Sequence, residues 1–84
     1  MIITNHVEKE LKNDNCETAD ALKVLETGNI LEPPEWDDKC GEFKYRVHGK
    51  TIDQEDAAVV EIFILENEIN IGVRLVTFWI KRRN

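Results

Sequence analysis

The hydrophobic period changes once along the chain, and this change constrains the fold more than any other feature. Before Pro33–Pro34, apolar residues recur every three to four positions, which is the spacing of a helix that buries one side. After the two prolines, apolar residues alternate with polar ones or run together, as they do in strands. Helices followed by neighbouring strands predict an α+β domain, in which the helices pack on one face of an antiparallel sheet.

The first predicted helix covers residues 5–12. Thr4 or Asn5 precedes it, and both residue types accept hydrogen bonds from the free N–H groups of a first helical turn. Val7 and Leu11 lie four positions apart and therefore share one side of the helix. We expect that side to face the sheet.

The second predicted helix covers residues 18–28. Thr18 is placed to act as its N-cap, and Asp20 follows in the first turn, where the helix dipole favours an acid. Gly28 follows the last turn, at the position where a left-handed C-cap residue is commonly found. Both ends of this helix are therefore marked in the sequence.

The remainder of the chain predicts strands. Residues 32–41 contain the two prolines and are interpreted as a loop, because proline donates no hydrogen bond to a sheet. The predicted strands are 29–31, 43–48, 57–65 and 69–80. The sequence thus predicts one α+β domain over residues 1–84, with two N-terminal helices on one face of a three- to four-stranded antiparallel sheet.

The last predicted strand carries three further expectations. Asn67 and Glu68 are expected to form a hairpin-like connection before it. Its odd-numbered residues, including Trp79, are expected to face the core. Gly72 is expected to mark a bulge or a close approach of the backbone.

The length and the net charge of the chain limit the classes of protein to which it can belong. With 84 residues the chain has room for one core, and no run of apolar residues approaches the roughly 18 needed to span a membrane. The first residues lack the apolar stretch of a signal peptide, so a cytoplasmic location is expected. The formal net charge of −6 argues against non-specific DNA or RNA binding, although it permits a local cationic face.

The best candidate for such a face is the strand at residues 43–48 and its continuation to Lys50. Basic residues occupy every second position and alternate with large apolar ones, so they should all project from the side of the sheet that faces away from the helices. Arginine binds phosphate through two parallel hydrogen bonds, lysine binds it as a point charge, and histidine can exchange protons near neutral pH. The candidate residues are Lys44, Arg46, His48 and Lys50, together with Arg74, Lys81 and Arg82 further along the chain.

A structural interpretation of the same row stays open. Polar residues on the solvated face of an antiparallel strand are the usual pattern and require no ligand. Glu61 or Glu66 on the next strand could also pair with Arg46 across the sheet.

Other chemistry-bearing residues give weaker signals. The four potential zinc ligands are Cys16, Cys40, His6 and His48, and they lack the close pairs that structural zinc sites use, so no metal or cofactor is expected. Trp36, beside the prolines, either anchors a protein partner or folds back over the edge of the core. The acidic residues at 53–56 lack the spacing of a calcium loop and are interpreted as a solvated turn.

Four short motifs in a fixed order resemble a group of small bacterial proteins. They are TNH at residues 4–6, ADALKVLETGNI at 19–30, YRV at 45–47 and VTFW at 76–79. The resemblance spans about residues 3–82 and is to MqsR-like toxins and the RelE/HigB toxin superfamily. It implies two helices on a small antiparallel sheet, an antitoxin protein as partner, and metal-independent cleavage of messenger RNA, often on the ribosome.

The resemblance also implies roles for individual residues. Arg46 would stabilise the phosphate, while His6 and His48 would be the candidates for proton transfer. Lys81 and Arg82 would bind the RNA backbone, assisted by Lys44.

The acidity of this chain departs from the pattern of those toxins, which are usually basic. Two functions therefore stay open. The first is an mRNA endoribonuclease with a local cationic face, and the second is a non-enzymatic protein-interaction module of the same fold that has lost RNA cleavage. A metal-dependent enzyme is the weakest of the hypotheses, because no ligand spacing supports it.

Overall fold

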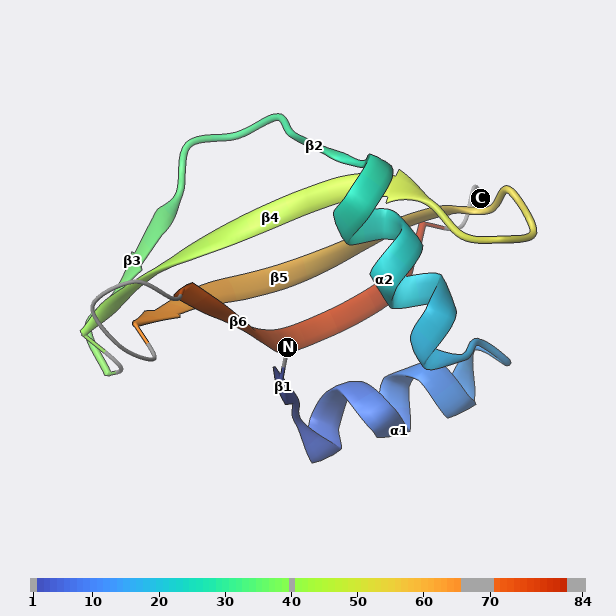
Figure 1. Cartoon of the computed structure of the whole chain (residues 1–84), viewed down its shortest axis with the longest axis horizontal. Coiled ribbons are helices and arrows are strands. Elements are labelled where there is room, and N and C mark those ends of the chain that lie inside the picture. The colour runs from blue at the N-terminus through green and yellow to red at the C-terminus, as the bar shows by residue number, and fades with distance from the viewer. Residues whose placement is uncertain (1, 40, 66–70, 82–84) are drawn as a thin grey trace.

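The computed structural model describes residues 2–39, 41–65 and 71–81. Within these residues, two helices and six strands follow one another (Figure 1). They are β1 (Ile2–Ile3), α1 (Asn5–Asn13), α2 (Thr18–Thr27), β2 (Asn29–Ile30), β3 (Glu35–Asp37), β4 (Glu42–Lys50), β5 (Asp56–Leu65) and β6 (Ile71–Ile80).

The strands form one mixed sheet, which corrects the expected antiparallel sheet of three to four strands. Its order is β1-β6-β5-β4-β2, and β3 pairs with a further part of β4. The three long strands pair antiparallel in chain order, as expected, but β1 lies parallel to β6. The sheet therefore has six strands and includes a parallel pair.

The strands that the sequence did not predict are the short ones. β1 has two residues and β3 has three, which is too few to show an alternation of apolar and polar residues. β3 also lies inside the segment interpreted as a loop, directly after the two prolines. Trp36 of β3 lies opposite Phe43 of β4, so this short strand is an ordinary antiparallel partner.

Both predicted helices are present, with corrections at their ends. The Thr4 hydroxyl accepts a hydrogen bond from the Val7 N–H at 3.3 Å and caps α1. In α2 the N-cap is Glu17 rather than Thr18, and its N–H donates to the Asp20 carboxylate at 2.8 Å. Gly28 has a φ of −81° and a ψ of 176°, so the predicted left-handed cap is wrong.

Gly28 is instead required by a close approach between α2 and β4. A Cβ atom at this position would lie 2.6 Å from the carbonyl oxygen of His48 and closer still to that of Val24. Gly49 on β4 faces the same contact, because its own Cβ would lie 3.1 Å from the Cα of Gly28. The two glycines therefore let the helix end pack directly against the strand backbone.

A β-bulge shifts the face pattern of β6. Val60 pairs with Thr77 whereas Glu61 pairs with Leu75, so Val76 is the extra residue. One extra residue moves every side chain beyond it to the other face of the sheet. Trp79 therefore lies on the face away from the helices, and its predicted core position is wrong. Gly72 pairs regularly with Ile64, so the bulge is also not at the expected glycine.

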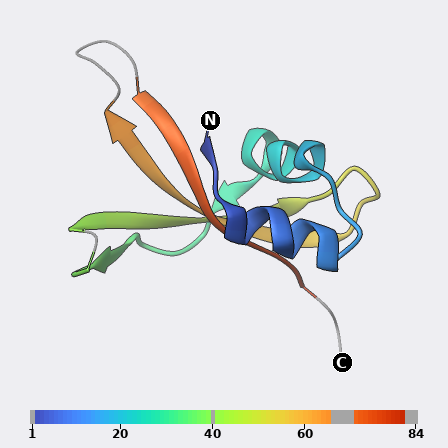
Figure 2. The ribbon, with the colours of Figure 1, turned by 90° about the horizontal axis from the view of Figure 1, so that it is seen from below.

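The two helices lie on one face of the sheet and cover only part of it. α1 packs against β6 and α2 against β4, and buried residues from these elements form the core with β5. The core residues are Val7, Leu11, Ala21, Val24, Val47, Ala57, Val59, Leu75, Phe78 and Ile80. Beyond the helices, β3, the beginning of β4, the end of β5 and the beginning of β6 project as a bare end (Figures 1 and 2).

Some expectations fall on residues outside the described ranges. These are the connection at Asn67 and Glu68, the role of Arg82 and the state of Cys40. Among the described helices, none has the length and apolar character that a membrane span requires.

Candidate active-site groove

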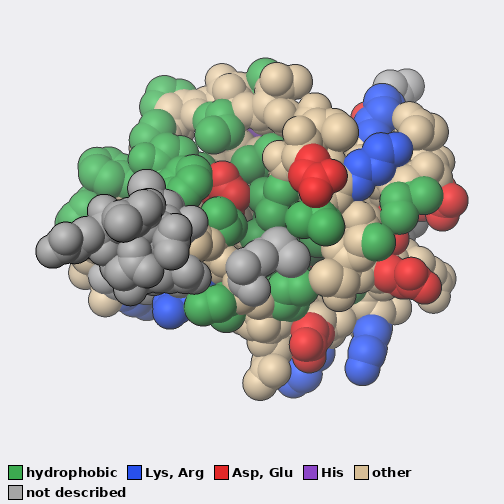
Figure 3. Space-filling model, viewed as in Figure 1, with side chains coloured by type: hydrophobic (Ala, Val, Ile, Leu, Met, Phe, Trp, Pro, Cys, Tyr) green, Lys and Arg blue, Asp and Glu red, His purple; other side chains and the backbone are tan. Residues whose placement is uncertain are grey.

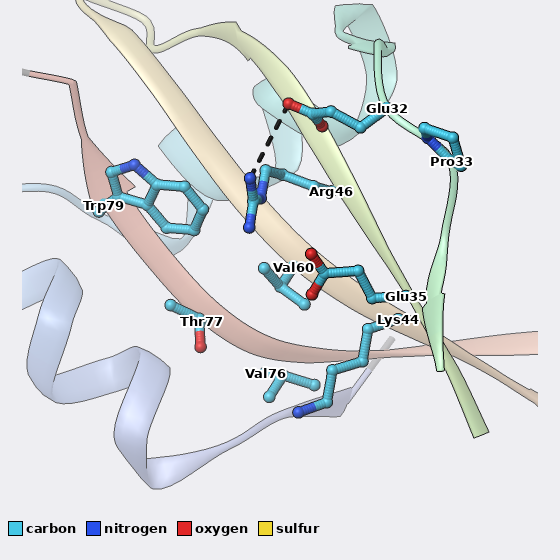
Figure 4. A pocket seen from close by; sticks show the side chains of 9 residues that line it. All are labelled: Glu32, Pro33, Glu35, Lys44, Arg46, Val60, Val76, Thr77 and Trp79. Atoms are coloured by element: carbon cyan, nitrogen blue, oxygen red, sulfur yellow. Dashed lines mark ion pairs between the residues drawn. The ribbon is translucent and has the colours of Figure 1, made fainter. Parts of the chain in front are cut away.

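The alternation in β4 places its basic residues on the face opposite the helices, as predicted. Val47 lies in the core, whereas Arg46 and Lys44 line a pocket of about 320 Å³ on the other face (Figure 4). The segment between β2 and β3 forms one wall of this pocket, and β6 forms the opposite wall. The residues that line it are Glu32, Pro33, Glu35, Lys44, Arg46, Val60, Val76, Thr77 and Trp79. We call this pocket the outer groove.

Arg46 occupies the centre of the outer groove. One guanidinium nitrogen lies 3.9 Å from a carboxylate oxygen of Glu32, and the guanidinium carbon lies 5.6 Å from the centre of the Trp79 ring. This distance allows a cation–π contact. Figure 4 shows the side chain between these two partners. Glu61, the partner considered from the sequence, lies opposite Tyr45 on the helix side of the sheet.

The bulge in β6 explains why Trp79 belongs to this groove. Without the extra residue Val76, the alternation would turn Trp79 toward the helices. The bulge instead turns Thr77 and Trp79 toward Arg46, and Val76 itself lines the groove. A bulge is a common way to redirect a side chain at a functional surface.

Glu32 is the functional candidate that the sequence did not identify. Both of its carboxylate oxygens accept the Nε2 hydrogen of His48, at 2.7 and 2.9 Å. This hydrogen bond lowers the pKa of Glu32 below its ordinary value, and the charges of His48, Arg46 and Lys81 add to the effect. Glu32 therefore stays ionised in the groove. Its only signal in the sequence is an acid directly before the two prolines, in a segment interpreted as a loop.

His48 supports Glu32 rather than facing the groove directly. Its side chain is 12% exposed, whereas that of Glu32 is 43% exposed. Two nitrogens in this cluster, His48 Nδ1 and Arg46 Nε, are buried without a hydrogen-bond partner among the described residues. His48 can thus hold and polarise the carboxylate, while Glu32 and Arg46 are the groups that an incoming ligand would meet.

The structure separates the other predicted site residues. Lys44 lines the outer groove and forms an ion pair with Asp37 of β3. Lys50 pairs with Asp56 at 2.9 Å and lines a second pocket, which His48 and Lys81 also line, so these three residues lie together outside the outer groove. Arg74 is exposed on β6, opposite Ile62, and does not line the outer groove.

His6 is not part of the outer groove. It is on α1, on the helix side of the sheet, and its Nε2 lies 3.1 Å from a carboxylate oxygen of Glu10. The same oxygen of Glu10 accepts a hydrogen bond from the Phe78 backbone N–H at 3.1 Å. Glu10 therefore ties α1 to β6, and His6 contacts this carboxylate from within the same helix.

The described residues contain no group of three or more histidine, cysteine or acidic side chains arranged to hold a metal ion. The outer groove combines two cations, two carboxylates and an aromatic wall. Such a set can bind a phosphate and accept a proton without a metal.

A family model matches most of the chain. Residues 3–77 match the family model described as a domain of unknown function, DUF4258. No curated protein and no solved structure matches the chain. Because the match covers most of the 84 residues, this protein belongs to the DUF4258 family.

Proposed function

We propose that this protein is a metal-independent endoribonuclease that acts on messenger RNA in the cytoplasm and is held inactive by an antitoxin protein. The observation that carries the proposal is the position of Arg46 between an ionised carboxylate and an aromatic wall in a groove of about 320 Å³. This volume lies at the lower end of the range typical for small-ligand sites. It would accommodate a nucleotide unit rather than a folded RNA.

The reaction requires a base, cations and an open groove. Glu32 would take the proton of the ribose 2′-hydroxyl, and the resulting oxygen would attack the adjacent phosphorus. The bond between phosphorus and the 5′-oxygen would break, and that oxygen would take a proton from solvent, to which Glu32 in turn would release the proton that it accepted. The products are a 2′,3′-cyclic phosphate and a 5′-hydroxyl end. Arg46 and Lys44 would stabilise the extra negative charge on the phosphate.

The ion pair between Arg46 and Glu32 does not prevent phosphate binding. Its atoms are 3.9 Å apart and both side chains are more than 40% exposed. Exposed pairs of this kind contribute little to stability, so a phosphate can replace the carboxylate as the partner of Arg46. After release from Arg46, the carboxylate of Glu32 would keep its hydrogen bond to His48 and could accept a proton.

The proposal is tested with a DNA oligonucleotide that contains a single ribonucleotide, incubated with the protein in the presence of EDTA. We expect cleavage after the ribose and a 2′,3′-cyclic phosphate end. Glu32→Gln keeps the size of the side chain but removes its charge, and should reduce the rate by about 100-fold or more. Arg46→Lys keeps the charge but loses the planar, two-pronged geometry, and should also slow cleavage strongly.

Lys9→Ala is the matched control, since Lys9 is an exposed cation on α1, away from the groove. Equal cleavage by wild type and Glu32→Gln would contradict the assignment of the base. Absence of cleavage with every RNA tested, together with normal growth and intact messenger RNA when the wild type is expressed in a bacterium, would reject the ribonuclease.

The pH dependence of cleavage gives a second test of the base. The pKa of Glu32 is lowered from the ordinary carboxyl value of 4.5, so the carboxylate stays ionised below that pH. We expect the acidic limb of the rate profile to fall below pH 4.5, measured under conditions where circular dichroism shows the fold intact. An acidic limb near pH 6 to 7 would instead indicate a histidine as the base.

A further inference from the structure

The aromatic residues of the chain are distributed unequally between the two ends of the sheet. Three of them are large and exposed on β3, β4 and β5: Trp36 is 54% exposed, Phe43 48% and Phe63 46%. Tyr45 follows Phe43 by two residues on β4. Two pairs of rings lie close together, Trp36 with Phe43 and Tyr45 with Phe63, each with centroids 4.9 Å apart. We call these four residues the aromatic end.

The register of the strands places the aromatic end on the same face as the helices. Trp36 lies opposite Phe43, and Tyr45 lies opposite Glu61, two residues before Phe63. Residues that face each other across antiparallel strands, and residues two apart along one strand, share a face. Val47 follows in the same row and is buried under the helices. The row therefore runs from the covered core to the bare end.

The surface of the aromatic end has the character of an interaction site. Figure 3 shows hydrophobic side chains gathered at the end of the molecule where β3 and the beginning of β4 lie. Single exposed apolar residues are normal on proteins, but a contiguous group of aromatic rings is not. Tryptophan, tyrosine and phenylalanine are also the residues that most often anchor partners.

The charges around the aromatic end favour a basic partner. Glu61 lies within the row, is 6% exposed, and has neither a hydrogen bond nor an ion pair within the described part of the chain. Burial raises its pKa. At the rim, the Trp36 indole donates to the exposed carboxylate of Asp38 at 2.7 Å. A lysine or arginine of a partner would pair with Glu61, whereas a second copy of this chain would bring acids against acids.

We propose that the aromatic end binds an amphipathic helix of a partner protein, with its apolar side on the rings and a lysine or arginine directed at Glu61. The helix would continue the layer that α1 and α2 form over the other half of the same face. This proposal concerns the face opposite the outer groove and does not depend on RNA cleavage.

The proposal is tested with two designed helical peptides of about 18 residues, roughly 27 Å long. Both carry the same leucine face, and they differ only in having lysine or glutamate at the flanking positions. Two-dimensional NMR of the isotope-labelled protein maps the binding surface, and titration gives the dissociation constants. We expect shifts at Trp36, Phe43 and Phe63, and binding of the lysine peptide at least about tenfold tighter.

Variants at two apolar positions of similar exposure distinguish specific binding at the aromatic end from non-specific hydrophobic binding. Phe63→Ser should weaken binding by about tenfold or more. Ile52→Ser is the control, since Ile52 is 53% exposed in the turn between β4 and β5, and binding should be unchanged. Glu61→Gln should remove most of the preference for the lysine peptide. Glu32→Gln should bind as the wild type does, whether or not the protein cleaves RNA.

Three outcomes would overturn the proposal. The first is equal affinity for the two peptides, and the second is shifts that centre on Ile52 or on the outer groove. The third is a dimer in sedimentation equilibrium that Phe63→Ser dissociates, because a second copy would then be the occupant.

Discussion

On β4 and β5, the two halves of the helix-side face differ in the size of their side chains. Under the helices, β4 and β5 present Val47, Ala57 and Val59, and glycines allow α2 to touch the strand backbone. Beyond the helices, the same strands present Phe43, Tyr45 and Phe63. Small residues permit close packing by the helices of the chain itself, whereas the bulky rings are left partly exposed. The difference indicates that one continuous face can be core at one end and exposed aromatic surface at the other, and we propose that a partner binds this exposed end.

The sharpest test of this comparison replaces one phenylalanine in each half. Phe78 is fully buried in the core, so Phe78→Ala should lower the free energy of unfolding by about 3–5 kcal/mol. Phe63 is 46% exposed, and Phe63→Ala should cost less than about 1.5 kcal/mol. Urea unfolding followed by circular dichroism measures both. Similar losses in the two variants would show that the aromatic end is part of the core.

Glycine replacements test the close approach of the covered half. Gly28→Ala would force a Cβ atom against backbone carbonyl oxygens, and should cost about 2–3 kcal/mol. Gly41, before β4 at the bare end, has a φ of +66° with open space around it, so Gly41→Ala should cost only about 1 kcal/mol, from backbone strain. Thermal unfolding of the two variants gives the order. The reverse order would mean that α2 can move away from β4.

Glu61 is the buried acid in this row, and its titration gives the smallest expected effect. Burial raises its pKa in the folded state above the ordinary 4.5, so the folded protein holds the proton more tightly than the unfolded chain. Its stability contribution is therefore lost as the pH rises from 4.5 through the folded-state value. Glu61→Gln should raise the melting temperature more at pH 8 than at pH 4. A gain that does not vary with pH would rule out this titration.

The sequence predicted the parts of the fold that have long, regular patterns. The alternation over residues 43–50 correctly placed Arg46 and Lys44 on one face and Val47 on the other. The spacing of Val7 and Leu11 correctly predicted the buried side of α1. These patterns are informative because each repeats several times over the length of one element.

Features that depend on distant contacts were not predictable in the same way. Glu32 reaches His48 across 16 positions, and nothing in its neighbourhood indicates that contact. The bulge at Val76 reversed the predicted face of Trp79, because a register shift depends on the partner strand as well as on the strand itself. Gly28 was correctly singled out, but its role is in packing rather than in capping.

The packing of α1 against β6 has a consequence for synthesis of the protein. α1 is made early, yet its main packing partner is β6, the last element of the described chain. A helix of nine residues is not stable alone in water. Val7 and Leu11 can therefore be buried in the core only after Leu75 and Phe78 have been synthesised. While the chain is still emerging from the ribosome, the core therefore lacks one wall. Folding is completed only after β6 has been released, and nascent chains truncated before it should bind chaperones rather than fold.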